Sequence, residues 1–156
     1  MLIIHCWDDF YFTRAPIRCK TTCHCERTKQ FIVNKNEFKK YRKRLNKTQK
    51  QMAELLGSSL KAIHSYEQGW RNIPAYVERQ LFFLVSMLLK KEKGTKPCWK
   101  VKKCSATQKT QCPAWEFGAG DFCWLINGTV CDGTVQQNWN EKMKICRSCE
   151  VFSYIL

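Results

Sequence analysis

The sequence predicts a mostly α-helical fold, in which five helices are followed by a small, irregular, cysteine-rich domain stabilised by metal. Apolar residues recur at helical spacing between residues 36 and 91, and small polar residues stand where helices would begin. From residue 98 this period is weak until residue 136, and seven of the chain's eleven cysteines lie between residues 98 and 149. With 156 residues and 44% apolar composition, the chain can form one domain or two small ones.

Residues 1–33 show no long hydrophobic period. We expect an N-terminal extension that is either disordered or upstream of the natural start. Its apolar beginning has no basic segment before it, so it does not resemble a signal peptide. The spacing of Cys19, Cys23 and Cys25 matches no established zinc pattern, and metal binding there is the less favoured alternative. The sequence indicates no role for Cys6.

The first helix is expected over the segment EFKKYRKRL, with Asn36 as its cap. Phe38, Tyr41 and Leu45 fall on one face of this helix, together with Arg42. The lysines fall on the opposite face, which is therefore expected to meet solvent.

Two short helices joined by a tight turn are predicted between Thr48 and Gly69. Thr48 can cap the first of them, Gly57 suits a left-handed stop, and Ser58 or Ser59 can cap the second. Gly69 ends the second helix. Apolar positions at helical spacing are Met52, Ala53, Leu55, Leu56, Leu60, Ile63 and Tyr66. Helix, glycine-containing turn and helix at this length is the pattern of a DNA-binding helix-turn-helix.

Pro74 suits the start of a fourth helix over residues 75–80, and a fifth helix is expected through residues 81–91. A break between these two is not required by the sequence. The apolar run from Leu81 to Leu89 is too short for a membrane span and fits a buried helix. Residues 94–97 form a polar linker, which divides a domain at 34–93 from one at 98–156.

The formal net charge of +14 indicates a polyanionic partner, nucleic acid before membrane. Residues 34–93 carry 14 Lys and Arg against 5 Asp and Glu, whereas residues 94–156 carry 8 against 5. The basic excess therefore coincides with the helix-turn-helix segment, where phosphate contacts need it. A merely solvated basic surface is the alternative.

Several positions together resemble the Cro/Xre class of phage-repressor-like helix-turn-helix proteins. They are Thr48-Gln49, Leu56-Gly57, the run from Tyr66 to Gly69, and Pro74. The resemblance covers residues 36–89. It implies a five-helix DNA-binding domain, double-stranded DNA as the partner, and a homodimer on that DNA.

The resemblance also implies which side chains meet DNA. Those expected to face base edges are Gln49, Ser59, Leu60, Lys61 and Ser65. An amide such as that of Gln49 suits adenine, and a lysine can donate to guanine. Those expected to hold phosphates are Thr48, Lys47, Gln68, Arg71 and Asn72. Ser59 can instead serve only as a cap, and Leu60 can instead pack in the core.

A shielded ion pair is implied as well. In this class an arginine of the first helix commonly pairs with the glutamate that follows the aromatic residue of the recognition helix. The matching residues here are Arg42 and Glu67.

The cysteine-rich segment contains two Cys-Trp pairs and ends in a C-x2-C. It resembles the small "two-CW" domain over residues 98–152, a family whose ligand is not settled. The candidate metal ligands are Cys98, Cys104, Cys112, Cys123, Cys131, Cys146 and Cys149. No histidine follows His64, so a metal site here would be thiolate or thiolate plus oxygen. An iron–sulfur cluster, structural zinc, and disulfides or buried free thiols all stay open. The tryptophans of this segment are expected to pack over the site.

These features favour a sequence-specific DNA-binding transcriptional regulator in the cytoplasm, with a metal-binding or redox-responsive tail. A redox or electron-transfer partner with a helical docking module is the alternative, and an antitoxin-like repressor is a third. We expect no enzyme, since no histidine or paired base lies near any cysteine of the tail.

Overall fold

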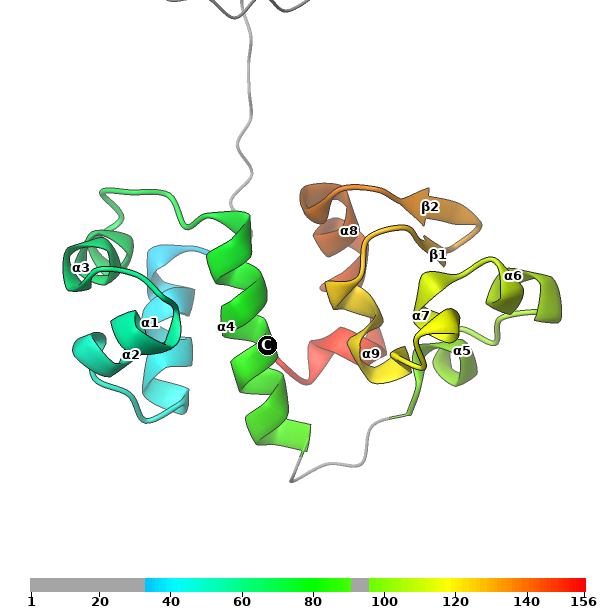
Figure 1. Ribbon diagram of the computed structural model, residues 1–156, viewed down its shortest axis with the longest axis horizontal. Coiled ribbons are helices and arrows are strands. Elements are labelled where there is room, and N and C mark those ends of the chain that lie inside the picture. The colour runs from blue at the N-terminus through cyan, green and yellow to red at the C-terminus, as the bar shows by residue number, and fades with distance from the viewer. Residues whose placement is uncertain (1–32, 91–95) are drawn as a thin grey trace, which may run out of the picture.

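A computed structural model describes residues 33–90 and 96–156 of the chain (Figure 1). The expectations for residues 1–32, and with them those for Cys6, Cys19, Cys23 and Cys25, lie outside the described residues. So does the first half of the expected linker. Helix α4 lies between helices α1–α3 on one side and the C-terminal elements on the other (Figure 1).

Helix α1 spans Lys35–Arg44 and is capped by Asn34. The Asn34 side chain accepts hydrogen bonds from the backbone amides of Asn36 (2.9 Å) and Glu37 (3.0 Å), and the Glu37 carboxylate accepts one from the Asn34 amide (3.0 Å). The prediction of Asn36 as the cap was therefore wrong. A reciprocal capping box needs Glu or Gln three residues after the cap, and only Asn34 has one.

The predicted helix-turn-helix consists of α2 (Gln49–Leu55) and α3 (Leu60–Gln68). Thr48 forms a capping box with Gln51, and Ser59 caps α3. Gly57 (φ +56°) and Gly69 (φ +78°) adopt the left-handed conformation that ends a helix at little cost for glycine.

Helix α4 runs without a break over Ala75–Lys90, so the described part of the chain holds four helices before the linker and not the five predicted. No glycine or proline interrupts this stretch. Val77, Leu81, Val85 and Leu89 are all buried at four-residue spacing. A single stripe of this kind needs one continuous helix to face the core.

The C-terminal part consists of short elements. They are α5 (Cys98–Val101), α6 (Ala106–Thr110), α7 (Pro113–Glu116), the 3₁₀-helix η1 (Gly120–Leu125), β1 (Thr129–Cys131), β2 (Thr134–Gln136), α8 (Trp139–Cys146) and α9 (Glu150–Ser153). The strands pair antiparallel, with Val130 opposite Val135. Asp132 (φ +50°) and Gly133 (φ +77°) form the two-residue turn between them, where both positions need a positive φ.

One hydrophobic core joins the helical and the cysteine-rich parts. Phe82 of α4 lies at its centre. The centroid of its ring is 5.6 Å from that of Tyr41 on α1, 5.0 Å from Phe152 on α9 and 6.3 Å from both Trp124 and Trp139. The C-terminal elements therefore bury the side of α4 that faces away from the helix-turn-helix.

Glu78 is a buried polar link within this core. Its carboxylate accepts a hydrogen bond from the Val33 amide (2.9 Å) and another from the Trp139 indole (2.7 Å). It thereby connects the start of the described chain, α4 and α8. A buried carboxylate with such partners favours one arrangement of the three over others.

The end of the chain is also bonded to α1. Lys40 donates to the Leu156 carbonyl (2.8 Å), and Arg44 donates to the Ile155 carbonyl (3.0 Å). The predicted division of the chain at residues 94–97 stays a prediction, and these contacts cross it.

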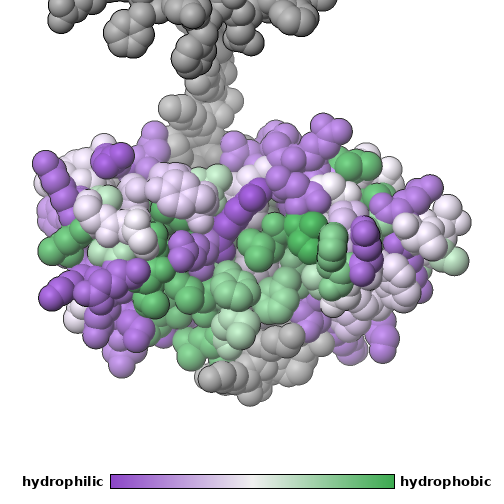
Figure 2. All heavy atoms as spheres, viewed as in Figure 1, coloured by the Kyte–Doolittle hydropathy of each residue, from purple (hydrophilic) through white to green (hydrophobic). Residues whose placement is uncertain are grey.

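Apolar side chains gather over α4 and the C-terminal elements beside it (Figure 2). The partly exposed members on α4 are Phe83, Met87 and Leu88. No helix in residues 33–90 or 96–156 is long and apolar enough to cross a membrane.

Candidate nucleic-acid interface and cysteine cavity

The outward face of α3 carries Leu60, Lys61, His64 and Gln68, all of them exposed. Leu60 is 50% exposed, so it does not pack in the core, which was the alternative to its facing a partner. The core side of α3 instead consists of Ala62, Ile63, Ser65, Tyr66 and Glu67. Leu60, the first residue of the helix, falls outside that stripe and is left for an external partner.

Two serines predicted to face DNA have different surroundings. Ser59 is exposed and its hydroxyl accepts a hydrogen bond from the Ala62 amide (3.1 Å), as a cap does. Ser65 is only 7% exposed, and its hydroxyl donates to the Lys61 carbonyl (2.8 Å). Little of Ser65 is left for contact with a base.

Thr48 and Gln49 lie together at the start of α2. Thr48 is exposed and exchanges capping hydrogen bonds with Gln51. The Gln49 side-chain amide donates to Glu67 (2.8 Å), which holds the amide group in one orientation. Its carbonyl oxygen can still accept a hydrogen bond from a partner.

Arg42 and Glu67 form a bidentate ion pair between α1 and α3. The Arg42 Nε lies 2.5 Å from one Glu67 carboxylate oxygen, and its Nη2 lies 3.1 Å from the other. Arg42 also donates to the Lys47 carbonyl (2.8 Å), at the loop before α2. The Glu67 side chain is 4% exposed, so this pair joins three segments of the motif largely out of water.

Burial alone would raise the pKa of Glu67. The hydrogen bonds from Arg42 and Gln49, together with the charge of Arg42, outweigh burial and hold the pKa of this carboxyl below its ordinary value. Glu67 is therefore ionised at neutral pH, and its pair with Arg42 fixes the angle between α1 and α3.

The loop after α3 adds further groups to this surface. Gln68, Arg71 and Asn72 are exposed, as expected for phosphate contacts. Trp70 is 71% exposed, and its ring centroid lies 5.3 Å from that of His64. Neither His64 nor Trp70 is among the side chains that the sequence predicts to contact DNA. The spacing of Lys61, His64 and Gln68, three and four residues apart, is the signal that places His64 on this face.

Five cysteines from separate elements line one cavity in the C-terminal part. They are Cys98, Cys104, Cys112, Cys123 and Cys131. Trp99 and Trp115 form part of its wall, with ring centroids 4.9 Å apart, as expected for tryptophans packing over the site. By contrast, Trp124 and Trp139 pack against α4.

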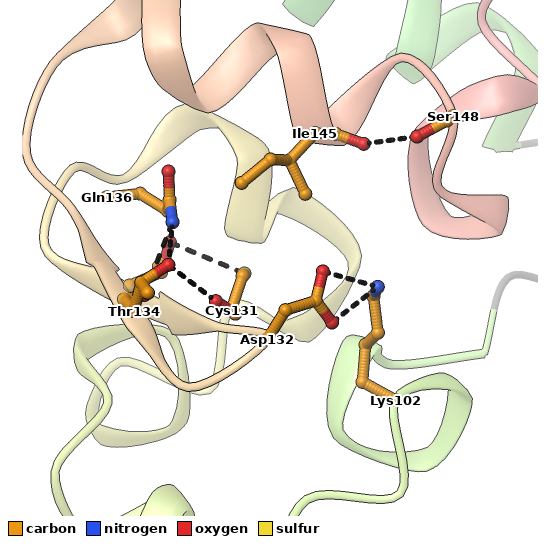
Figure 3. A network of polar contacts seen from close by, with 8 residues as sticks. Lys102, Cys131, Asp132, Thr134, Gln136, Ile145 and Ser148 are labelled. Carbon is orange, nitrogen blue, oxygen red and sulfur yellow. Dashed lines mark hydrogen bonds and ion pairs between the residues drawn. The ribbon is translucent and has the colours of Figure 1, made fainter.

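An ion pair stands beside the cavity. Lys102 lies 3.1 Å from one carboxylate oxygen of Asp132, in the turn that follows Cys131 (Figure 3). This contact connects α5 to the hairpin, and Lys102 also lines the cavity. Both side chains are partly in solvent, so the pair contributes little to stability.

Lys142 of α8 is fully buried close to these thiols. Its ammonium group contacts the hydroxyl of Thr129, which also lines the cavity. Its charge acts on Cys98, Cys131 and Cys146. No sequence prediction includes Lys142, although it lies three residues after Trp139 and four before Cys146, on the core face of a helix.

The thiols differ in acidity. The hydrogen bond from Cys123 lowers the pKa of Cys98, although burial opposes this. The same hydrogen bond, together with burial, raises the pKa of Cys123. Burial raises the pKa of Cys146 to about 12, partly offset by the charge of Lys142.

In residues 33–90 and 96–156, no three His, Cys, Asp or Glu side chains are close enough together to hold an ion as they stand. Cys146 and Cys149, the C-x2-C expected to chelate from one turn, do not line the cavity. The seven candidate ligands thus divide into a set of five around a cavity and a pair outside it.

Comparison with known proteins bears on the helical part alone. A family model described as Helix-turn-helix matches residues 38–76, which contain α2 and α3. Searches of curated proteins and of solved structures return no significant match to the chain. The "two-CW" resemblance of the cysteine-rich part is not shown. The matched segment is that of a helix-turn-helix family of DNA-binding regulators, and it supports a DNA-binding regulator in general terms.

Proposed function

We propose that this protein is a sequence-specific transcriptional regulator that binds double-stranded DNA through α3. The observation that carries the proposal is the outward face of α3, where Leu60, Lys61, His64 and Gln68 are all exposed to solvent. A helix that only packed in a core would not expose so many side chains of this kind along one face. The match of residues 38–76 to the helix-turn-helix family supports the same conclusion.

Base contacts are assigned to the start and centre of α3. Lys61 can donate to the O6 and N7 atoms of guanine, and Leu60 can contact the methyl group of thymine. His64 lies one turn further along the same face and adds a third candidate. The Gln49 carbonyl can accept from the amino group of adenine or cytosine.

Phosphate contacts are assigned to the two ends of the motif. Thr48 at the start of α2 and Arg71 and Asn72 after α3 are exposed on either side of the recognition helix. Such contacts fix the position of a protein on the duplex without reading sequence. We place the regulator in the cytoplasm as a homodimer on paired half-sites, as the Cro/Xre resemblance implies.

The experiment compares Lys61→Ala with Lys100→Ala, an exposed lysine in the cysteine-rich part. Binding to a selected DNA site and to random duplex is measured at two salt concentrations. Lys61→Ala should weaken binding to the selected site about 5–150-fold, because a base contact is worth about 1–3 kcal/mol. It should also reduce the preference of the protein for one base over the others at one position of the site. Lys100→Ala should change neither.

Two results would overturn the proposal. One is that selection from random duplexes enriches no sequence. The other is that Lys61→Ala and Lys100→Ala reduce binding equally at both salt concentrations, which would indicate a diffuse charge effect only.

A further inference from the structure

We propose that the five-cysteine cavity is a thiolate metal centre and that Lys142 is the buried cation that balances its negative charge. This inference concerns the C-terminal part and stands independently of DNA binding. It chooses among metal, disulfides and free thiols, which the sequence leaves open.

The first step is the burial of Lys142. Its side chain has no exposed surface, and the hydroxyl of Thr129 is its hydrogen-bond acceptor. An ammonium group carries three donors, and burying it with one neutral acceptor among the residues that the structure describes costs several kcal/mol. A lysine at such a position therefore needs negative charge nearby.

The second step is the identity of the groups that its charge reaches. They are thiols of two elements: Cys131 of β1, whose thiol contacts the same Thr129 hydroxyl (4.0 Å), and Cys146, one helical turn further along α8. Neutral thiols and disulfides carry no charge, so neither would compensate the ammonium group. Thiolates bound to a metal do, because four of them outweigh the charge of a divalent cation or of an iron–sulfur core.

The third step is the cavity. Five thiols on α5, η1, β1 and the loops beside α6 and α7 surround it, so its ligands come from elements that no short motif would bring together. Trp99 and Trp115 form part of its wall. Four thiolates complete a tetrahedral site, and five candidates supply them.

Metal binding requires a local adjustment. Because no three thiols of the described residues are already close enough to share an ion, their side chains must turn inward. Metal–sulfur bonds to zinc are about 2.3 Å long. Each thiol that ligates zinc or a preassembled iron–sulfur cluster releases one proton to solvent, and this ligation step consumes no oxidant or reductant.

The shared chemistry is thiolate ligation of a thiophilic transition metal, either zinc or an iron–sulfur cluster. The full-length protein is purified without oxygen and under reducing conditions from cells supplied with zinc and iron. Elemental analysis should find about one centre per chain. Brown protein with iron and acid-labile sulfide identifies a cluster, and colourless protein with zinc identifies a zinc site.

Cobalt provides a second readout. After chelation, Co²⁺ is added to the reduced protein. We expect the intense thiolate-to-cobalt charge-transfer bands and the visible bands of tetrahedral coordination. Protein that contains no metal above background and yields no such bands would overturn the proposal. So would protein without metal in which the cavity cysteines are recovered as disulfides by mass spectrometry.

Matched variants test the assignment of residues. Cys112→Ser and Cys123→Ser should lower cobalt affinity at least about tenfold, whereas Cys149→Ser, outside the cavity lining, should retain it. Lys142→Met keeps the length of the side chain and removes its charge. It should weaken cobalt binding about tenfold or more, while Lys144→Met, exposed on the same helix, should not.

Circular dichroism checks that each variant is folded. If Cys123→Ser or Lys142→Met does not fold, Cys104→Ser at a less buried thiol provides the comparison with Cys149→Ser. Equal cobalt affinity in Cys104→Ser, Cys112→Ser and Cys149→Ser would overturn the cavity as the site. A folded Lys142→Met variant with unchanged affinity would overturn the role of Lys142.

Discussion

The helical part and the cysteine-rich part of this molecule are held together by different physical means. Helices α1–α3 each begin at a residue whose side chain caps the helix. In contrast, α5, α7 and α9 have four residues each and no side-chain cap. Isolated helices of that length are not stable in water. The stability of the cysteine-rich part therefore depends on its packing against α4, on close contacts such as those around Gly120, and on the residues that line its cavity.

The two parts share a row of packed aromatic rings. The rings of Trp124, Trp139 and Phe152 meet Phe82, and Phe82 meets Tyr41 on α1. Trp124 directly follows Cys123 of the cavity in sequence. One row of packed rings therefore connects the element that carries Cys123 to α1, and Arg42 of α1 is paired with Glu67 of α3.

The largest expected effect comes from removing the shared ring. Phe82→Ala should destabilise the protein by about 3–5 kcal/mol, because a fully buried aromatic side chain leaves a cavity. Urea unfolding is followed by circular dichroism for the helices and by tryptophan fluorescence for the C-terminal part. Both signals should shift together.

Phe117→Ala is the control, since Phe117 is 70% exposed and its loss should change stability by no more than about 0.5 kcal/mol. If Phe82→Ala separates unfolding into two transitions, with the helical signal unchanged, the dependence of one part on the other is disproved.

The second effect is confined to the helical part. Glu67→Ala leaves Arg42 as a largely shielded cation without its carboxylate, which should cost about 3 kcal/mol. Lys61→Ala, on the exposed face of α3, should cost no more than about 0.5 kcal/mol and chiefly weaken DNA binding. Thermal melting of both variants measures the two losses of stability. Equal, small shifts would contradict this division of roles.

The pH dependence of the stabilisation by Glu67 provides a further test. Because the pKa of Glu67 is lower in the folded protein than in the unfolded chain, its stabilisation is fully present above the unfolded pKa. It is lost as the pH falls through the lower, folded value. The difference in stability between the protein and Glu67→Gln should therefore shrink in acid, and an unchanged difference at low pH would refute the assignment.

The third effect is confined to the cysteine-rich part. A Cβ at Gly120 would lie 2.5 Å from the Cβ of Pro97 and 2.7 Å from the Trp99 ring. Gly120→Ala must displace Trp99, which lines the cavity, at a cost of about 1–3 kcal/mol. Urea unfolding measures the loss. Gly118→Ala, with open space around its Cβ but a φ of +61°, controls for backbone strain alone. A larger loss in Gly118→Ala would contradict the role of the Trp99 contact.

The helical part could be predicted from local signals because each one acts within a few residues. Thr48, Gly57, Ser59 and Gly69 stand where the sequence places them. Asn36 was mistaken for the cap because two asparagines, Asn34 and Asn36, lie two positions apart, and only the reciprocal bond of Glu37 distinguishes them.

The cysteine-rich part could not be predicted in the same way because its site depends on contacts distant in sequence. The C-x2-C of Cys146 and Cys149 is the strongest local pattern, yet five other cysteines surround the cavity. Lys142 has no signal of its own, since a lysine within a short helix is ordinarily exposed. Only its position on the core face of α8, between Trp139 and Cys146, distinguishes it.

The smallest expected effect tests whether the helical part carries its stability in local caps. Thr48→Ala removes one side-chain acceptor at the start of α2 and should cost about 1 kcal/mol. Ser105→Ala removes an equivalent capping box from α6 in the cysteine-rich part. Helix α6 has five exposed or partly exposed residues, so its loss should cost less than that of α2, whose Met52 and Ala53 are buried. Urea unfolding of both variants gives the two costs. If Ser105→Ala proves the more damaging, the cysteine-rich part depends on its own local signals after all, and packing on α4 explains less of its stability.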